Sequence, residues 1–172
     1  MSIGEGLSKE GMNMASRASV LKHPIHPMLV PFPIGLWIFS LVSDIIYGFG
    51  WGGPIWNDIA FYTMAGGIVG GLAAAVPGLV DYWSMSDPQP AKIAKMHMIL
   101  NVTIVGIFIV NLWLRTTQPP GASLPLILSL VGVILLGLSG WLGGELVYVH
   151  GVAVESSPPS AGGKKPRASM ER

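Results

Sequence analysis

The sequence predicts an all-α integral membrane protein built as a four-transmembrane-helix bundle. Of its 172 residues, 51% are hydrophobic and only 11% are charged, whereas a soluble domain carries about 25% charged residues. Four apolar segments are long enough to cross the hydrocarbon core of a bilayer, which takes roughly 20 helical residues. The net charge of +1 says nothing about nucleic acid, and no stripe of Lys and Arg suggests it, so no nucleic acid partner is expected.

The four predicted spans lie at about residues 28–49, 57–82, 93–114 and 124–148, within a membrane domain of residues 23–155. The first ends at the Gly-rich stretch GFGWGGP, and the second begins at Asn57 and Asp58, residue types that favour helix starts. The third ends at Arg115, and the fourth begins near Pro125, which fits a first helical turn. Residues 1–22 form a polar segment without the apolar run of a signal peptide. Residues 156–172 are predicted to be a disordered tail.

The distribution of Lys and Arg predicts the orientation. Nine of the ten Lys and Arg residues fall on one side of the predicted membrane, and only Arg115 falls on the other. Because loops rich in Lys and Arg stay in the cytoplasm, both termini and the middle loop are expected to be cytoplasmic.

The stretch HPIHPMLVPFP, residues 23–33, precedes the first span. A residue before proline is disfavoured in the helical region, so His23, His26, Val30 and Phe32 are predicted to be extended or turn-like, with regular helix from about Pro33. The stretch would then form a Pro-rich re-entrant lead-in that presents His26, and with it His23, to the cytoplasmic mouth of the bundle. An interfacial linker whose imidazoles meet lipid headgroups stays an open alternative.

An even number of membrane crossings brings all four histidines to one end of the bundle: His23, His26, His97 and His150. Asp81, Glu145 and Asn101 share that end and are candidate partners that would orient the imidazoles. The chain has no cysteine, which removes disulfides, thiolate metal sites and thioether-linked haem. A cofactor site is therefore expected to use imidazole ligands.

Three functions remain open. The first is binding of haem b for electron transfer, with axial ligands drawn from the four histidines. The second is a non-haem site for Zn, Fe or Cu, formed by His26, His97 and His150. The third is a membrane scaffold or accessory subunit whose histidines and carboxylates form a hydrogen-bonded cap. No nucleophile triad or phosphate loop indicates catalysis.

Small residues recur at four-residue spacing in two of the predicted spans. The pairs are Gly66 with Gly70, Gly67 with Gly71, and Gly140 with Gly144. Such spacing is typical of close helix–helix approach. The alternative is a flat cofactor that lies against these surfaces without Cβ atoms.

The blocks HPIHPMLVPFPIGL, AAVPGLVDYW, MHMILNV and SGWLGGELVYVHGVAV resemble the bacterial membrane family called domain of unknown function 2231. The resemblance covers about residues 23–154 and implies a four-span protein of the bacterial inner membrane. Relatives are sometimes joined to, or found beside, Rieske-type iron–sulfur domains, which implies redox work. The expected partners are the lipid bilayer and a Rieske-type or other redox protein or a quinone; a homo-oligomer stays open. The recurring features of the family fall on His23, His26, Asp81, His97, Glu145 and His150.

Overall fold

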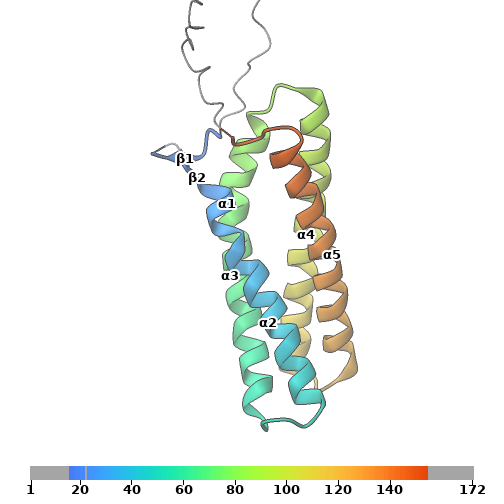
Figure 1. Cartoon of the computed structure of the whole chain (residues 1–172). Helices are drawn as coiled ribbons and strands as arrows, with labels where there is room; N and C mark the ends of the chain where they lie inside the picture. Colours follow the sequence, from blue (N-terminus) through green and yellow to red (C-terminus); the bar gives the residue numbers. More distant parts are fainter. Residues whose placement is uncertain (1–15, 22, 155–172) are drawn as a thin grey trace, which may run out of the picture.

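The structure is a computed structural model that describes residues 16–21 and 23–154. Two short antiparallel strands, β1 (Ser19–Val20) and β2 (His23–Pro24), lead into the short helix α1 (Ile25–Leu29). Four long helices follow as an up-and-down bundle (Figure 1): α2 (Pro31–Gly48), α3 (Ile55–Trp83), α4 (Pro88–Thr117) and α5 (Ser123–Tyr148). The N-terminal segment and the tail predicted from the sequence fall largely outside the described residues.

Four stretches of helix are long and apolar enough to cross a membrane. They are Ile25–Gly48, Ile55–Trp83, Pro88–Thr117 and Ser123–Tyr148, and each has a mean hydropathy of at least 1.7 over its most apolar window. Large apolar side chains such as Val69, Val102 and Trp141 are exposed on the outside of the bundle, where lipid would cover them. The predicted fold class, a four-transmembrane-helix bundle, is confirmed.

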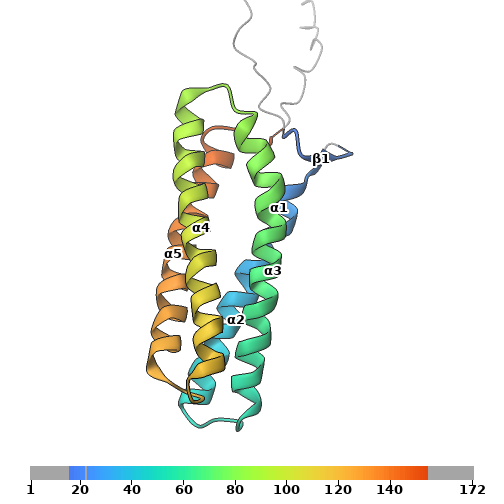
Figure 2. The ribbon, with the colours of Figure 1, turned by 180° about the vertical axis from the view of Figure 1, so that it is seen from behind.

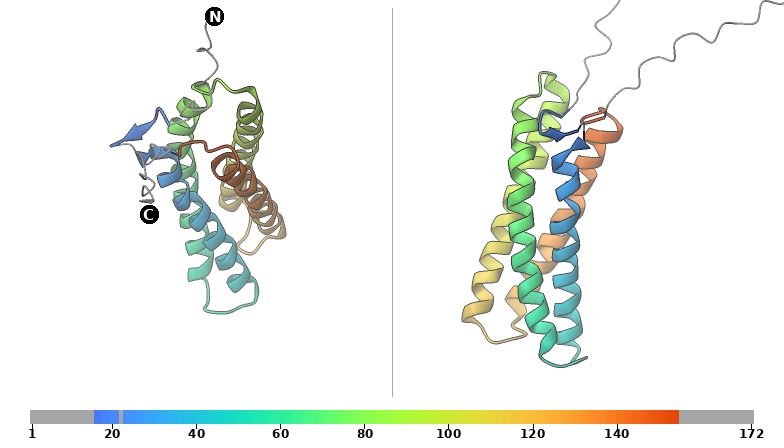
Figure 3. Two further views of the ribbon diagram at one scale, coloured as in Figure 1. Left: turned by 45° about the horizontal axis from the view of Figure 1, so that its top comes forward. Right: turned by 90° about the vertical axis from the view of Figure 1, so that its left-hand side faces the viewer.

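His23 lies in β2 and is extended as expected, but the rest of the lead-in is helical, which corrects the expectation that His26, Val30 and Phe32 are extended or turn-like. His26 lies within α1, and Val30, between α1 and α2, has helical dihedral angles (φ −54°, ψ −35°). The first backbone N–H groups of a helix have no intrahelical acceptor. Little helical hydrogen bonding is therefore lost at Pro27 in the first turn of α1 and at Pro31 at the start of α2. The bond from Val30 N–H to His26 O (3.1 Å) links the two pieces, which run on as one bent rod (Figure 3).

The helices pair as two hairpins, α2 with α3 and α4 with α5, and the hairpins pack through α3 against α4 and α2 against α5. Figure 2 shows α3 and α4 side by side from behind. The buried core joins all four helices through Trp37, Met64, Ile68, Ile104, Phe108 and Leu136. At its centre the rings of Trp37 and Phe108 stack with centroids 4.4 Å apart and an interplanar angle of 10°.

The two ends of the bundle carry different polar groups. The β1–β2 hairpin, α1, the α3–α4 connection and the residues after α5 lie together at one end (Figure 1); we call it the histidine end, because His26 and His97 lie there. The α2–α3 and α4–α5 connections lie at the other end, which we call the ion-pair end after Asp44 and Arg115. The cytoplasmic placement of the histidine end stays a prediction from the distribution of Lys and Arg.

The two hairpins are repeats of one packing unit. Three contacts across the bundle each join residues 71 positions apart: His26 with His97, Trp37 with Phe108, and Asp44 with Arg115. When equivalent residues of two repeats touch each other, the contact lies on the axis that relates the repeats. The three contacts therefore mark an approximate two-fold axis that runs along the bundle.

The second helix of each hairpin repeats its contacts too, at an offset of 65 positions (from 74 to 139 and from 67 to 132). At the histidine end, His26 binds the carbonyl of Ala74, and His97 binds the carbonyl of Ser139. In the core, Trp37 packs on Gly67, and Phe108 packs on Gly132. Nearer the other end, Ser40 binds the carbonyl of Ala60, and Asn111 binds the carbonyl of Pro125. A shared sequence pattern, H-x-x-L-x5-G-x-(W/F)-I-x-x-L, begins at residue 26 and again at residue 97. This pattern is the sequence signal of the repeat.

Candidate functional site

His26 is held between α1 and α3. Its Nδ1 lies 2.7 Å from the carbonyl oxygen of Ala74. One turn further along α3, Gly78 leaves room for the ring, because a Cβ at Gly78 would lie 2.8 Å from His26 Nδ1. The imidazole is half-buried. Helix α3 provides both the carbonyl that it binds and the space that its ring occupies.

His97 is held between α4 and α5 in the same way. Its Nδ1 lies 2.9 Å from the carbonyl oxygen of Ser139 and 3.1 Å from Ser139 Oγ. Asn101 Nδ2 donates to His97 O (2.8 Å) and to Ser139 Oγ (2.7 Å). A Cβ at Gly143 would lie 3.2 Å from His97 Cε1. Asn101, a predicted partner of the imidazoles, thus belongs to the network around His97.

The two rings are neighbours across the bundle, with centroids 6.3 Å apart and planes at 89°. A backbone carbonyl only accepts hydrogen bonds, so in each ring Nδ1 carries the proton that is donated. The other nitrogen, Nε2, then keeps its lone pair in the neutral imidazole. The pair is therefore two imidazoles of the same tautomer, each with one nitrogen able to bind a metal ion.

The other two histidines do not join this pair as a cluster. His23 is exposed, and its Nδ1 lies 2.9 Å from the carbonyl oxygen of Leu21. His150 follows the end of α5, where its backbone N–H donates to Glu145 O (3.2 Å). Within residues 16–21 and 23–154, no group of three or more His, Cys, Asp or Glu side chains is placed to hold a metal ion. The expected set of His26, His97 and His150 therefore has no counterpart in the described part of the chain.

Asp81 was expected to orient an imidazole, but its carboxylate binds the N-terminal segment instead. It accepts hydrogen bonds from Ser16 Oγ (2.8 and 2.9 Å) and from the backbone N–H of Ala18 (3.0 Å). Glu145 contributes its backbone carbonyl to the turn that ends α5. No hydrogen bond between its side chain and an imidazole is found among the described residues.

The glycine pairs of α3 pack against α2. Added Cβ atoms at Gly66, Gly67, Gly70 and Gly71 would meet the side chains of Leu36, Trp37 and Pro33. This contact supports close helix approach for these pairs. Gly140 meets no atom within 4 Å, and Gly144 meets only Tyr148 of its own helix. The glycines beside the imidazoles are Gly78 and Gly143, which were not predicted from the sequence. Their equivalent positions in the two repeats are the sequence signal that identifies them.

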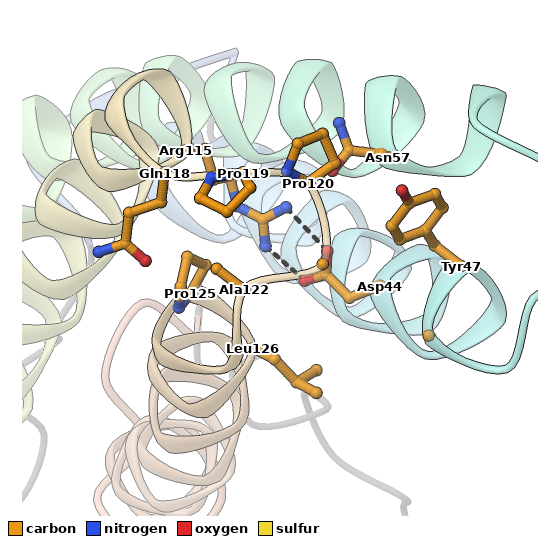
Figure 4. A pocket seen from close by; sticks show the side chains of 12 residues that line it. Asp44, Tyr47, Asn57, Arg115, Gln118, Pro119, Pro120, Ala122, Pro125 and Leu126 are labelled. Atoms are coloured by element: carbon orange, nitrogen blue, oxygen red, sulfur yellow. Dashed lines mark hydrogen bonds and ion pairs between the residues drawn. The ribbon is translucent and has the colours of Figure 1, made fainter.

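A second polar site lies at the ion-pair end, where Arg115 of α4 pairs with Asp44 of α2 through two bonds of 2.7 and 2.5 Å (Figure 4). Ser129 and Asn111 complete the network: Ser129 Oγ donates to Asp44 (3.1 Å), and Arg115 Nε donates to Asn111 Oδ1 (3.2 Å). Both charged side chains are at most 10% exposed. Arg115 was expected on this side of the membrane from the distribution of Lys and Arg, but its pairing with Asp44 was not predicted.

These features define a class of protein: a four-span integral membrane bundle of two repeated hairpins with one polar pair near each end. More particularly, the chain belongs to the family described as predicted membrane protein DUF2231, whose model matches residues 22–156. The resemblance found in the sequence is thereby confirmed. No curated protein and no solved structure matches the chain.

Proposed function

We propose that this protein binds one haem b in the membrane, with His26 and His97 as its two axial ligands, and that it serves in electron transfer. The observation that carries the proposal is the pair of half-buried imidazoles 6.3 Å apart, each with its Nδ1–H given to a backbone carbonyl. Metal-ligating histidines almost always donate their second ring N–H to such a carbonyl or to a carboxylate, which fixes the tautomer and the ring orientation.

The number of imidazoles favours haem over a non-haem metal ion. Sites for zinc take three or four protein ligands, and no group of three candidate ligands is found within the described residues. Haem iron takes only one or two axial ligands from the protein, and a pair of histidines meets that need. The 6.3 Å between the ring centroids is a suitable spacing for two imidazoles on one metal ion, because each metal–nitrogen bond is about 2.0–2.1 Å long.

The packing at the histidine end suits a flat ring between the hairpins. His26 is bonded within the first hairpin and His97 within the second, and at this end no hydrogen bond between described residues joins the two hairpins. At the ion-pair end, by contrast, Asp44 is bonded to both Arg115 and Ser129 of the second hairpin. The hairpins are joined at the histidine end by the α3–α4 connection and by packing, so side chains there can repack around a ring without breaking a hydrogen bond between the hairpins. Bound haem would supply reversible one-electron chemistry.

The test is the reduced-minus-oxidised absorption spectrum of the full chain, purified in detergent from cells supplied with a haem precursor. We expect a sharp reduced α band and one haem per chain. His26→Ala and His97→Ala should each abolish or strongly reduce it. His23→Ala and His150→Ala, matched controls that remove the other two imidazoles of the chain, should leave the haem content and the band position unchanged.

Other outcomes would overturn the proposal. Stoichiometric zinc, copper or iron without a Soret band would favour the non-haem site. Neither haem nor metal in a folded preparation would leave the scaffold role. A haem that survives both His26→Ala and His97→Ala but is lost in His150→Ala would place the ligands elsewhere.

A further inference from the structure

The ion-pair end contains a pocket of about 110 Å³ where the ends of all four long helices meet. Its walls are Asp44 and Tyr47 from α2, Asn57 from α3, Arg115 from α4, the connection of residues 118–122, and Pro125 and Leu126 from α5. Figure 4 shows these side chains around the Asp44–Arg115 pair. The pocket shares no residue with the histidine pair, so it is a separate site.

Several polar groups of this pocket have hydrogen-bonding capacity left over. The side chains of Tyr47, Asn57 and Gln118 line it and make no hydrogen bond to another described residue. The guanidinium of Arg115 has five N–H groups, of which Nε, one on Nη1 and two on Nη2 are used by Asn111, Asp44 and Ser129. One Nη1–H is left. The lining thus offers both donors and acceptors, while Asp44 already neutralises the charge of Arg115.

The remaining walls are apolar and reach the outer surface of the bundle. Leu126 is 37% exposed, on an α5 that is apolar enough to span the membrane. Pro119, Pro120 and Gly121 are exposed at the rim, and the ring of Tyr47 stands against Gly121, where a Cβ would lie 3.1 Å from Tyr47 Cε1. At about 110 Å³ the pocket is smaller than the cavity of about 150 Å³ that encloses benzene, but it is open at its rim, so a single six-membered ring would be bound partly inside it.

We propose that this pocket binds the headgroup of a membrane benzoquinone. A quinone is uncharged, which is compatible with a pocket where Asp44 and Arg115 neutralise each other. Its two carbonyl oxygens accept hydrogen bonds of the kind that the side chains of this pocket can donate. Its isoprenoid tail is apolar and would leave along the lipid-facing side at Leu126. A single ring can enter the open pocket in part, whereas the fused rings of a naphthoquinone would need still more room.

The experiment is equilibrium binding of a benzoquinone with one isoprene unit to the full chain in lipid nanodiscs, with empty nanodiscs as the correction for partition into lipid. We expect saturable binding, weakened about tenfold or more in the double variant Asn57→Ala/Gln118→Ala, because two hydrogen bonds are removed. Tyr47→Phe should weaken binding more modestly, since it removes one hydroxyl and keeps the ring. An azido derivative of the quinone should label peptides that contain residues 44–57 or 115–126.

The matched control is Thr116→Ala/Thr117→Ala at the same end of the bundle. Both hydroxyls are exposed and bind carbonyls of their own helix, Trp113 O at 2.7 Å and Leu114 O at 3.1 Å, so binding should be unchanged. Thermal unfolding midpoints verify that each variant is folded. Three results would overturn the proposal: no saturable binding above empty nanodiscs, labelling of peptides at the histidine end, or equal binding by the double variant and the wild type. None of them bears on haem binding by His26 and His97.

Discussion

At the scale of single residues, the imidazoles are placed by what lies behind them. His26 and His97 are each hydrogen-bonded to a backbone carbonyl of a neighbouring helix. One turn further along that helix, a glycine leaves space for the imidazole ring. The carbonyl fixes the tautomer, and the glycine lets the helices approach closely enough for that bond to form. The two glycines, Gly78 and Gly143, are thus as specific to the site as the histidines.

Alanine at Gly78 should displace the His26 ring. The new Cβ would lie 2.8 Å from Nδ1 and 2.9 Å from Cε1, so the ring must move and the bond to Ala74 O is lost. Overpacking of this kind destabilises by about 1–3 kcal/mol. We expect a lower thermal unfolding midpoint in detergent, and haem content reduced relative to the wild type. Gly143→Ala should be milder, because its Cβ would lie 3.2 Å from His97 Cε1.

Gly140→Ala is the control for helix propensity. Gly140 is exposed on α5, and a Cβ there would meet no atom within 4 Å. Replacing an unhindered helical glycine by alanine is neutral or stabilises by up to about 1 kcal/mol. If Gly78→Ala and Gly140→Ala had the same thermal unfolding midpoint and the same haem content, the packing of the His26 ring against Gly78 would be wrong.

At the scale of elements, the N-terminal segment is fastened to the bundle by one carboxylate. Asp81, near the end of α3, accepts hydrogen bonds from Ser16 and Ala18, and Ala18 O accepts the N–H of Ile25 at the start of α1 (2.9 Å). The β1–β2 hairpin therefore rests on α3 through side-chain and backbone bonds at its base.

Asp81→Ala should release this segment without affecting the histidine pair. We expect faster tryptic cleavage after Arg17, because the backbone around it loses its anchor, and an unchanged haem content. Limited proteolysis followed by mass spectrometry measures the first effect, and the absorption spectrum measures the second. Asp58→Ala, at the far end of the same helix, is the control. Loss of haem in Asp81→Ala with an uncut N-terminal segment would instead support the role expected from the sequence, in which Asp81 orients an imidazole.

The sequence predicts the depth of a residue along the bundle better than its direction around a helix. Apolar length was enough to predict four spans, and the count of crossings placed His26 and His97 at one end, where the structure has them. Asp81 shares that end but binds Ser16, because depth alone does not say which helix a side chain faces. The lead-in at His26 differs for another reason: the extended preference of residues before proline is weaker than the helical bonds and packing of α1 and α2. Gly78 and Gly143 become visible only once the repeat is recognised.

At the scale of the whole molecule, the approximate two-fold axis explains why polar pairs occur at both ends. Equivalent positions of the repeats meet on the axis, so residues there must be compatible with their own counterparts. Two imidazole rings satisfy this at the histidine end, and two stacked rings satisfy it in the core. Two like charges would repel, and the ion-pair end instead has Asp44 in one repeat and Arg115 in the other. Opposite charges at equivalent positions hold the hairpins together.

Exchanging these charges tests the axis. Asp44→Ala and Arg115→Ala should each be strongly destabilising, by about 3–5 kcal/mol, because each leaves a buried charge without its partner. In the double exchange Asp44→Arg/Arg115→Asp, each charge enters the equivalent position of the other repeat. We expect the unfolding midpoint to recover by more than half of the loss seen in the single variants. Recovery should be incomplete, because Arg115 is also bound by Asn111 and Ser129. The equivalent positions around residue 44 hold Ser40 and Met64, which do not offer an arginine the same hydrogen bonds. A double exchange no more stable than the single variants would show that positions 44 and 115 are not equivalent, and the repeat would then not extend to this end of the bundle.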